Sequence, residues 1–506
     1  MTRTQKFLGG VATGYLNMAL VTLVGLWLTA FYLRQLGEQD YGLWLVVAQI
    51  LAYVGLLDLG MLALLPREVA YVTGKSGSRA GPDVAARATE ILTLTLWQLP
   101  VVLLAGGAVL WLLPTDWAPL RWPLAIVLGA FALAFPARVF QGVLRGLQDL
   151  AYLGIVQTAS WGVGVVVAVV LVFRGWGLFA LAVGWAATQL TGPMLWLVRL
   201  RQQFPETMPG APQRLSRADL RRYLQSGGWI SLTQIAHVLI AGTDLLIVGR
   251  MLGPGTVVLY FCTAKLVSVL GHQPQMLLEA AQPGLAQMRT GESRQNVARV
   301  CAALSQAMLL LSGVIVCVVL AVNEGFVTWW VGAAQYGGFW LTATLVGTML
   351  LRHWNATSVY ALFALGHERR IALTTLADGV TTVLAQIALA RLLGPVGVAV
   401  GSLIGVTLIA LPANLTTLGR ETSGLGVMLR ALAPWAWRFA LVLTVAVAVA
   451  RAWPSLGLAG FSAVGAGIGL LYAALGLRLV LGGELSVYVR PHLARLQAVM
   501  ARSGEV

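Results

Sequence analysis

The chain has 506 residues, of which 58% are hydrophobic and only 10% are charged. A soluble domain carries about a quarter charged residues, so this composition excludes a soluble globular protein and indicates an integral membrane protein. The net charge of +15 is typical of basic cytoplasmic loops in a membrane protein, and we expect no nucleic-acid partner.

Fourteen segments are apolar enough to predict membrane-spanning helices, which need about 20 residues each. Their approximate limits are 10–33, 43–65, 91–113, 123–144, 151–173, 178–198, 227–249, 257–280, 300–322, 341–365, 371–390, 397–418, 435–450 and 458–480. With the N-terminus inside, 24 of the 34 Lys and Arg residues fall in inner segments, six in outer segments and four within spans. This distribution predicts that both termini are cytoplasmic.

The motif Arg-x-Leu-Gly punctuates the apolar segments. It begins at Arg34, Arg250 and Arg391, and Arg34 and Arg250 end the first and seventh spans, 216 residues apart. Arg174, in the related stretch Arg-Gly-Trp-Gly, and Arg391 end the fifth and eleventh spans, 217 residues apart. A cation at a helix C-terminus complements the helix dipole and a glycine terminates the helix, so the motif predicts helix ends. The common offset equals six spans and therefore predicts a parallel repeat of two six-helix lobes.

The predicted fold is an all-α polytopic membrane protein with about 14 transmembrane helices. Two helices follow the repeat. The predicted parts are an N-terminal six-helix lobe at 1–198, a basic cytoplasmic linker at 199–226, a C-terminal six-helix lobe at 227–418, and two extra helices with a cytoplasmic tail at 419–506.

The first eighty residues contain "YLRQLGEQDYGLW", followed by "LLDLGMLALLPREVA". These motifs resemble the start of bacterial polysaccharide (oligosaccharide-lipid) flippases of the multidrug/oligosaccharidyl-lipid/polysaccharide exporter superfamily, and a weaker resemblance extends to about residue 420. The resemblance implies two six-helix bundles around a central cavity that opens to one side at a time. It also implies that a polyprenyl-pyrophosphate-linked oligosaccharide is flipped from the cytoplasmic to the periplasmic leaflet of the bacterial inner membrane.

Several charged side chains fall within the predicted spans, where each costs about 2.5–3.5 kcal/mol on insertion scales unless it finds a partner or water. In the eighth span Lys265, His272 and Glu279 recur every seven residues, which places them on one stripe of a helix. In the tenth span Arg352 and His353 lie near the middle of the membrane. We expect such polar faces to line a shared aqueous cavity.

Polar residues within the spans form two sets of candidates. The candidate substrate-binding residues are Arg138, Lys265, His272, Arg352 and His353. The candidate ion-coupling residues are Asp58, His237, Asp244, Asp378 and Glu279. Arginine and lysine are natural counter-charges of a pyrophosphate, whereas histidine and carboxylates can carry protons. The alternative is static contact between helices, for instance between Asp244 and Lys265.

The residues favour a secondary transporter over an enzyme. The sequence has no Walker loop and no metal-ligand spacing, and the three cysteines form no CxxC pair, so we expect no catalytic residue, metal or cofactor. Trp161 and Trp354 are further candidates for stacking on sugar rings. The expected partners are the lipid-linked oligosaccharide, membrane lipids and other polysaccharide-assembly membrane proteins.

Three alternative functions remain beside the polysaccharide flippase. The extra pair of helices resembles the layout of lipid-linked peptidoglycan-precursor flippases of the same superfamily. A drug or ion antiporter of the superfamily is a second alternative, although Lys265 and Arg352 favour an anionic substrate over cationic drugs. A membrane glycan polymerase or ligase is a third, but it would need a longer outer loop than any in this sequence.

The predicted topology can be tested with a reporter fused after Val506. We expect a reporter that works only in the cytoplasm to be active there, because the number of spans is even and the inner segments carry most of the basic residues. Activity of a periplasmic reporter at the same position would remove one span from the count, and the short segment 435–450 would be the first to reconsider.

Overall fold

The computed structural model describes residues 3–76, 81–213, 215–287, 293–422, 424–453, 457–482 and 485–486. Every regular element in these ranges is helical, with no strand among them. The chain divides into two compact units, Met1–Val238 and Leu239–Val506. The predicted all-α, polytopic fold class is confirmed, while the parallel repeat and its lobe boundaries stay predictions.

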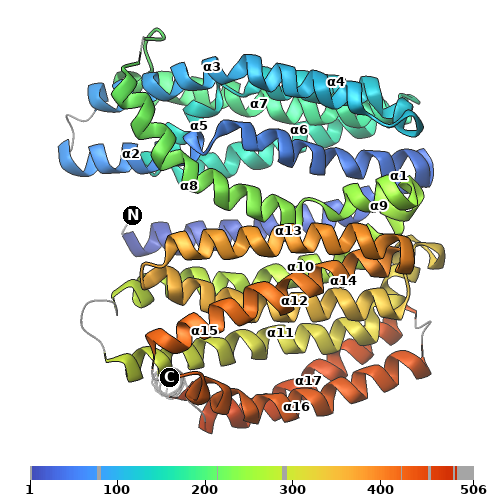
Figure 1. Ribbon diagram of the computed structural model, residues 1–506. Helices are drawn as coiled ribbons and strands as arrows, with labels where there is room; N and C mark the ends of the chain where they lie inside the picture. The colour runs from blue at the N-terminus through green and yellow to red at the C-terminus, as the bar shows by residue number, and fades with distance from the viewer. Residues whose placement is uncertain are drawn as a thin grey trace, which may run out of the picture. The chain divides into compact units, whose positions relative to one another are not determined.

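The N-terminal unit is built from long helices joined by short turns (Figure 1). Its elements are α1 (Arg3–Gly55), η1 (Leu56–Asp58), α2 (Met61–Ser76), α3 (Gly81–Leu112), η3 (Thr115–Leu120), α4 (Arg121–Ala134), α5 (Arg138–Gly146), α6 (Leu150–Phe173), α7 (Leu178–Gln203), η4 (Pro205–Thr207) and α8 (Arg217–Ala241), whose last residues lie beyond the unit. Helix α7 packs against α6 and α4, and α2 packs against α5 and α3.

The C-terminal unit surrounds one helix, α11. Its elements are α9 (Asp244–Leu252), α10 (Pro254–Gln287), α11 (Arg294–Val331), η6 (Ala333–Gln335), α12 (Phe339–Ala364), α13 (Glu368–Leu393), α14 (Pro395–Gly405), the π-helical turn η7 (Val406–Ala410), α15 (Leu411–Glu421), α16 (Leu425–Ala452) and α17 (Leu458–Gly482). Helix α11 packs against α10, α12, α16 and α17. It is accordingly the most buried of the apolar helices.

Eleven helices in the described ranges are long and apolar enough to cross a membrane, or twelve if α8 and α9, bent by 46°, form one broken span. Most of the fourteen predicted segments lie within one helix, but 43–65 runs from α1 through η1 into α2, 123–144 runs from α4 into α5, and 227–249 runs from α8 into α9. The counts differ because α1 contains the first predicted segment and most of the second, and because α12, with Arg352 and His353 in its middle, is too polar to count as a span by composition.

Each Arg-x-Leu-Gly motif ends a helical segment at its glycine. Gly37, Gly253 and Gly394 have φ values of 80°, 94° and 59°, in the left-handed region that glycine adopts at little cost. Gly37 breaks α1, so the first two predicted spans lie on either side of it. Gly253 and Gly394 follow directly after α9 and α13. The predicted helix-ending role of the motif is confirmed.

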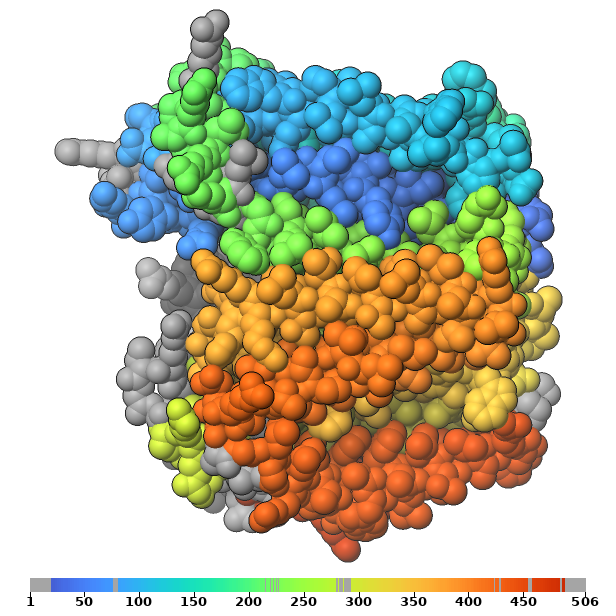
Figure 2. Space-filling model, in the orientation of Figure 1, coloured from blue at the N-terminus to red at the C-terminus, as the bar shows by residue number. Residues whose placement is uncertain are grey.

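The outer surface of the units carries large apolar side chains. Helix α3, light blue in Figure 2, contributes to the surface of the N-terminal unit and exposes Trp97, Leu104 and Trp111. Side chains of this size are unfavourable in water when they gather on one surface, but they suit contact with lipid. This surface supports the assignment of a membrane protein made from composition.

Helices α6 and α7 approach closely through small residues. A Cβ atom added to Gly164 would lie 2.5 Å from the Gly184 carbonyl oxygen and would collide with the Thr188 hydroxyl. A Cβ atom at Gly184 would lie 2.6 Å from the Ala168 Cβ. Small residues at such crossings let helix backbones pack tightly in the absence of a hydrophobic driving force between helices.

We expect Gly164→Val to destabilise the N-terminal unit, because overpacking a close contact costs about 1–3 kcal/mol. The measurement is the midpoint of thermal aggregation of the purified protein in detergent. Gly162→Val is the matched control, since Gly162 lies on the same helix and an added Cβ there meets no atom within 4 Å. Equal midpoints for the two variants would contradict the close packing of α6 and α7.

Candidate functional site

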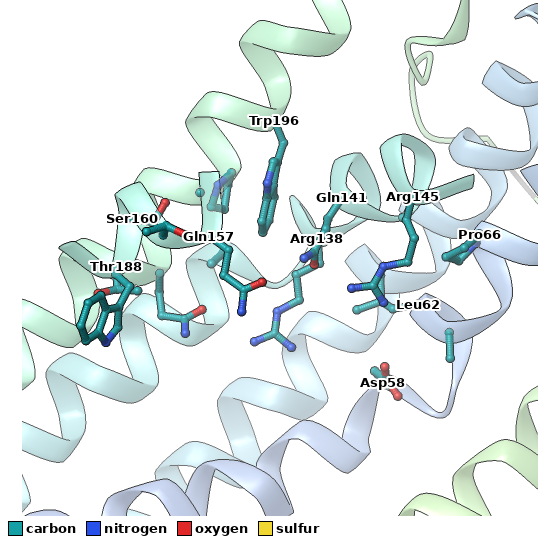
Figure 3. Close-up of a pocket in the computed structure, with 18 of the residues that line it drawn as sticks. Asp58, Leu62, Pro66, Arg138, Gln141, Arg145, Gln157, Ser160, Thr188 and Trp196 are labelled. Atoms are coloured by element: carbon teal, nitrogen blue, oxygen red, sulfur yellow. The ribbon is translucent and has the colours of Figure 1, made fainter. Parts of the chain in front are cut away.

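A cavity of about 600 Å³ lies within the N-terminal unit (Figure 3). Its walls come from η1, α2, α5, α6 and α7, with smaller contributions from α1 and α4. The volume falls within the range of roughly 300–1,000 Å³ typical of small-molecule sites. The wall contains both charged and uncharged polar side chains, which is unusual for a membrane-spanning bundle and marks the cavity as the candidate site.

Two arginines of the short helix α5 face the cavity. Arg138 begins the helix and Arg145 follows two turns later on the same face, with Gln141 between them. The Arg138 guanidinium lies over the Phe131 ring, 4.4 Å from its centroid. Within the described part of the chain, neither arginine forms an ion pair or a hydrogen bond. Both guanidinium groups therefore retain their donors for a ligand or for water.

Asp58 is the acidic residue of the cavity wall, and the turn in which it lies explains the Leu-Leu-Asp-Leu-Gly motif. Its Oδ1 accepts a hydrogen bond of 2.7 Å from the Gly60 N–H. Leu59 and Gly60 both have positive φ, 50° and 70°, and the carboxylate stabilises this tight turn between η1 and α2. The Asp58 carbonyl also accepts a hydrogen bond from Gln98 Nε2 on α3 at 3.2 Å.

The remaining polar wall of the cavity is uncharged and comes from α6 and α7. It contains Gln157, Ser160, Trp161, Gln189 and Trp196. Ser160 is 4% exposed, and its Oγ and the Trp196 Nε1 are buried without a hydrogen-bond partner. Fourteen side-chain atoms of the described residues are buried without a partner, and these two are the ones that belong to residues of the cavity wall.

Arg352, by contrast, is bound within the C-terminal unit. Its guanidinium on α12 donates to Asp378 Oδ2 on α13 at 2.9 Å and to the Ser402 carbonyl on α14 at 3.2 Å. Asp378 is 1% exposed, and its other oxygen accepts a hydrogen bond from Thr382 Oγ1 at 3.1 Å. The pair joins three helices, and this geometry supports the static alternative for Arg352 and Asp378.

Asp244 also has partners in the C-terminal unit. Tyr260 Oη donates to one carboxylate oxygen at 2.9 Å, and Gln386 Nε2 donates to the other at 2.7 Å. The same Gln386 nitrogen lies 2.9 Å from Ser402 Oγ. These contacts support the static alternative for Asp244, but its partners are Tyr260 and Gln386 rather than Lys265. The Lys265 Nζ instead lies over the Phe261 ring, 5.1 Å from its centroid.

The remaining candidates lie outside the cavity of the N-terminal unit. His353 is buried, and its Nδ1 shares a hydrogen bond of 2.7 Å with Ser312 Oγ. His272 is exposed on α10, and His237 is exposed on α8. The side chain of Glu279 lies outside the described residues. The roles proposed for these residues stay predictions.

The structure thus brings together only part of the set chosen from sequence. Asp58 and Arg138 face one cavity, and Arg352 meets Asp378. Sequence reasoning did not select Gln157, Ser160 or Trp196. A signal existed for the first two, because residues 157, 160 and 161 follow the i, i+3, i+4 spacing of one helix face.

Comparison with known proteins agrees with this fold. Residues 130–335 match the family model of polysaccharide biosynthesis proteins. No protein of curated function matches the chain by sequence. The structure is similar to the lipid II flippase MurJ in an inward closed conformation, with a TM-score of 0.67 and 10% identity, over 94% of this chain and 99% of that one.

Two further solved structures are similar over most of their length. One is an outward-facing multidrug resistance MATE family transporter of the MOP superfamily, with a TM-score of 0.56 and 16% identity, over 81% of this chain and 94% of that one. The other is a MOP superfamily transporter from Pyrococcus furiosus, for which a reverse polarity of the binding pocket suggests a different function. Its TM-score is 0.53 and its identity 17%, over 81% and 94% of the two chains.

The chain has the fold that these solved structures of a flippase and two transporters share. Residues 130–335, less than half of the chain, resemble polysaccharide biosynthesis proteins. Both findings agree with the resemblance to polysaccharide and lipid flippases that the first eighty residues carry.

Substitution of the Arg352–Asp378 ion pair distinguishes the two roles considered for Arg352, which are static contact between helices and substrate binding. We expect Arg352→Ala to lower the level of folded protein, because removal of one partner leaves a buried carboxylate uncompensated, at a cost of about 3–5 kcal/mol. Arg352→Ala combined with Asp378→Asn should restore much of that level. Protein level is measured by detergent size-exclusion chromatography of a fluorescent fusion. A normal level with lost export in the single variant would instead support a role of Arg352 in substrate binding.

Proposed function

We propose that this protein is a secondary transporter that flips a polyprenyl-pyrophosphate-linked oligosaccharide, the repeat unit of a cell-surface polysaccharide, from the cytoplasmic to the periplasmic leaflet. It acts in the bacterial cytoplasmic membrane with both termini in the cytoplasm, alongside other polysaccharide-assembly membrane proteins. The shared fold of the lipid II flippase and of the MOP superfamily transporters supports transport by alternating access.

The observation that carries the proposal is the pair of arginines in the cavity. Arg138 and Arg145 present guanidinium groups without ion-pair partners among the described residues. A guanidinium within a membrane-spanning bundle is costly unless an anion or water compensates it. Its planar set of donors matches phosphate oxygens in a bidentate manner. A pyrophosphate headgroup fits this wall, whereas a cationic drug does not.

The source of energy is an ion gradient or the substrate gradient itself, since the sequence has no phosphate-binding loop for ATP. Asp58 lines the cavity close to the two arginines (Figure 3), so its carboxylate is our first candidate for coupling to a cation or proton. Asp244 and Asp378 remain candidates, although their oxygens already accept hydrogen bonds from neighbouring helices.

A peptidoglycan precursor is the second candidate substrate, and one observation favours it. The similarity to the lipid II flippase covers 94% of this chain, whereas the similarity to the multidrug transporter covers 81%. The same cavity chemistry serves both substrates, because each headgroup carries a pyrophosphate. The first proposal is preferred because residues 130–335 match the family of polysaccharide biosynthesis proteins.

The proposal is tested with the purified protein in liposomes that contain a fluorescent prenyl-pyrophosphate-linked disaccharide. We expect Arg138→Gln and Arg145→Gln each to weaken apparent substrate affinity about tenfold to a hundredfold, since hydrogen bonds to charged groups are worth about 1.5–3 kcal/mol. Flipping is measured as the loss of fluorophore accessible to a quencher outside the vesicles.

Arg121→Gln is the matched control, because Arg121 is an exposed arginine of the same unit at the start of α4 and does not line the cavity. Wild-type flipping in all three variants would show that the cavity arginines do not hold the headgroup, and the proposed function would lose its main support.

A further inference from the structure

The wall of the cavity is divided by charge. Arg138, Arg145 and Asp58 lie together at the η1 and α5 side, whereas Gln157 and Ser160 lie on the other side of Arg138 (Figure 3). We propose that the uncharged part, formed by Gln157, Ser160, Trp161, Gln189 and Trp196 and called here the sugar subsite, binds the sugar attached to the pyrophosphate and accepts only a neutral one. This inference rests on the proposed function.

The geometry of two helices builds the sugar subsite. On α6, residues 157, 160 and 161 occupy one face at i, i+3 and i+4. On α7, Gln189 and Trp196 lie seven residues apart and so share a face. The close crossing of α6 and α7 at Gly164 and Gly184 holds these two faces at a fixed distance. The subsite is therefore built on rigid elements rather than on loops.

Two polar atoms of the subsite lack a hydrogen-bond partner. Ser160 Oγ and Trp196 Nε1 are both buried and make no hydrogen bond within the described residues, and both residues line the cavity. A hydrogen bond from either atom to a sugar requires a small movement of its side chain, and it would recover the free energy that a buried, unpartnered donor costs. The hydroxyl of Ser160 can donate or accept, whereas the indole N–H only donates.

The side chains of the subsite match the chemistry of a pyranose. The carboxamides of Gln157 and Gln189 each offer donors and an acceptor, as ring hydroxyls and an acetamido group require. The indoles of Trp161 and Trp196 offer flat apolar faces with one polar edge, which suits a ring with both C–H and hydroxyl groups. The arrangement is complementary to a neutral hexose or N-acetylhexosamine next to the pyrophosphate.

An acidic sugar is disfavoured by the same wall. The cationic residues that line the cavity, Arg138 and Arg145, belong to α5, and the α6 and α7 residues of the wall carry no formal charge. A uronate carboxylate placed in the sugar subsite would lose water without gaining a counter-charge there. Selectivity for a neutral sugar would then have two sources: the hydrogen bonds that the neutral sugar gains, and the unpaired carboxylate that an acidic sugar would bury.

The test compares three soluble probes that share one short prenyl chain: the bare pyrophosphate, the pyrophosphate linked to N-acetylglucosamine, and the pyrophosphate linked to glucuronic acid. Dissociation constants are measured by calorimetry with the full-length protein in detergent. We expect the N-acetylglucosamine probe to bind about five- to tenfold more tightly than the bare pyrophosphate. The glucuronic acid probe should bind no more tightly than the bare pyrophosphate.

Variants of the sugar subsite then test whether its residues cause the tighter binding of the N-acetylglucosamine probe. Gln157→Leu and Ser160→Ala should each reduce the advantage of the N-acetylglucosamine probe to about twofold or less, while Gln157→Arg should shift the preference toward the glucuronic acid probe. Thr191→Val is the control, because Thr191 lies on α7, donates to the Ala187 carbonyl and does not line the cavity. That variant should keep the full advantage.

The outcomes separate the two levels of the proposal. If the wild-type protein binds the bare pyrophosphate as tightly as the N-acetylglucosamine probe, or gains equally from glucuronic acid, the sugar subsite is wrong and the flippase proposal stands. If none of the three probes binds, the proposed function itself fails. An advantage that persists in Gln157→Leu and Ser160→Ala places the sugar elsewhere and also overturns the subsite.

Discussion

A charged side chain in a membrane-spanning helix must find a counter-charge, backbone acceptors or water, because lipid offers none of them. This constraint divides the arginines of the protein into two kinds. Arg352 satisfies it internally, with a carboxylate and a carbonyl on two neighbouring helices. Arg138, at the start of the nine-residue helix α5, faces a cavity instead, and the exposed Arg145 lines the same wall. The pairing of Arg352 joins helices of its unit, whereas the cavity leaves room for water or a ligand beside Arg138.

Glycine has two structural roles in this protein. Where φ is positive, as at Gly37, Gly253 and Gly394, it ends a helix next to the arginine of the motif. Where helices cross, as at Gly164 and Gly184, it lets α6 and α7 approach until their polar residues face the same space. The cavity therefore depends on residues that contribute no polar atom to it. Gly164 and Gly184 therefore cannot be recognised from the pattern of charged and polar side chains in the sequence.

The spans were predictable because about 20 apolar residues leave a clear signal, whereas helix pairing leaves almost none. Asp378 and Arg352 each lie on a polar stripe, and the sequence shows both stripes. Periodicity does not tell whether such a stripe meets water or another helix, so the pairing of these residues, 26 positions apart, appeared only in three dimensions. Gln157 and Ser160 were missed because uncharged polar residues cost little in a span and attract little notice.

The turn at Asp58 connects the cavity to the rest of the N-terminal unit. Asp58 lines the cavity. Its carboxylate accepts a hydrogen bond from the Gly60 N–H, and its backbone carbonyl accepts one from the Gln98 side chain on α3. Directly after it, Leu59 adopts a left-handed conformation that costs a β-carbon-bearing residue about 1–3 kcal/mol. Gly60 and Gly227 of α8 are in such close contact that a Cβ at Gly60 would lie 2.9 Å from the Gly227 carbonyl oxygen. The strained turn therefore connects the cavity wall with α3 and α8.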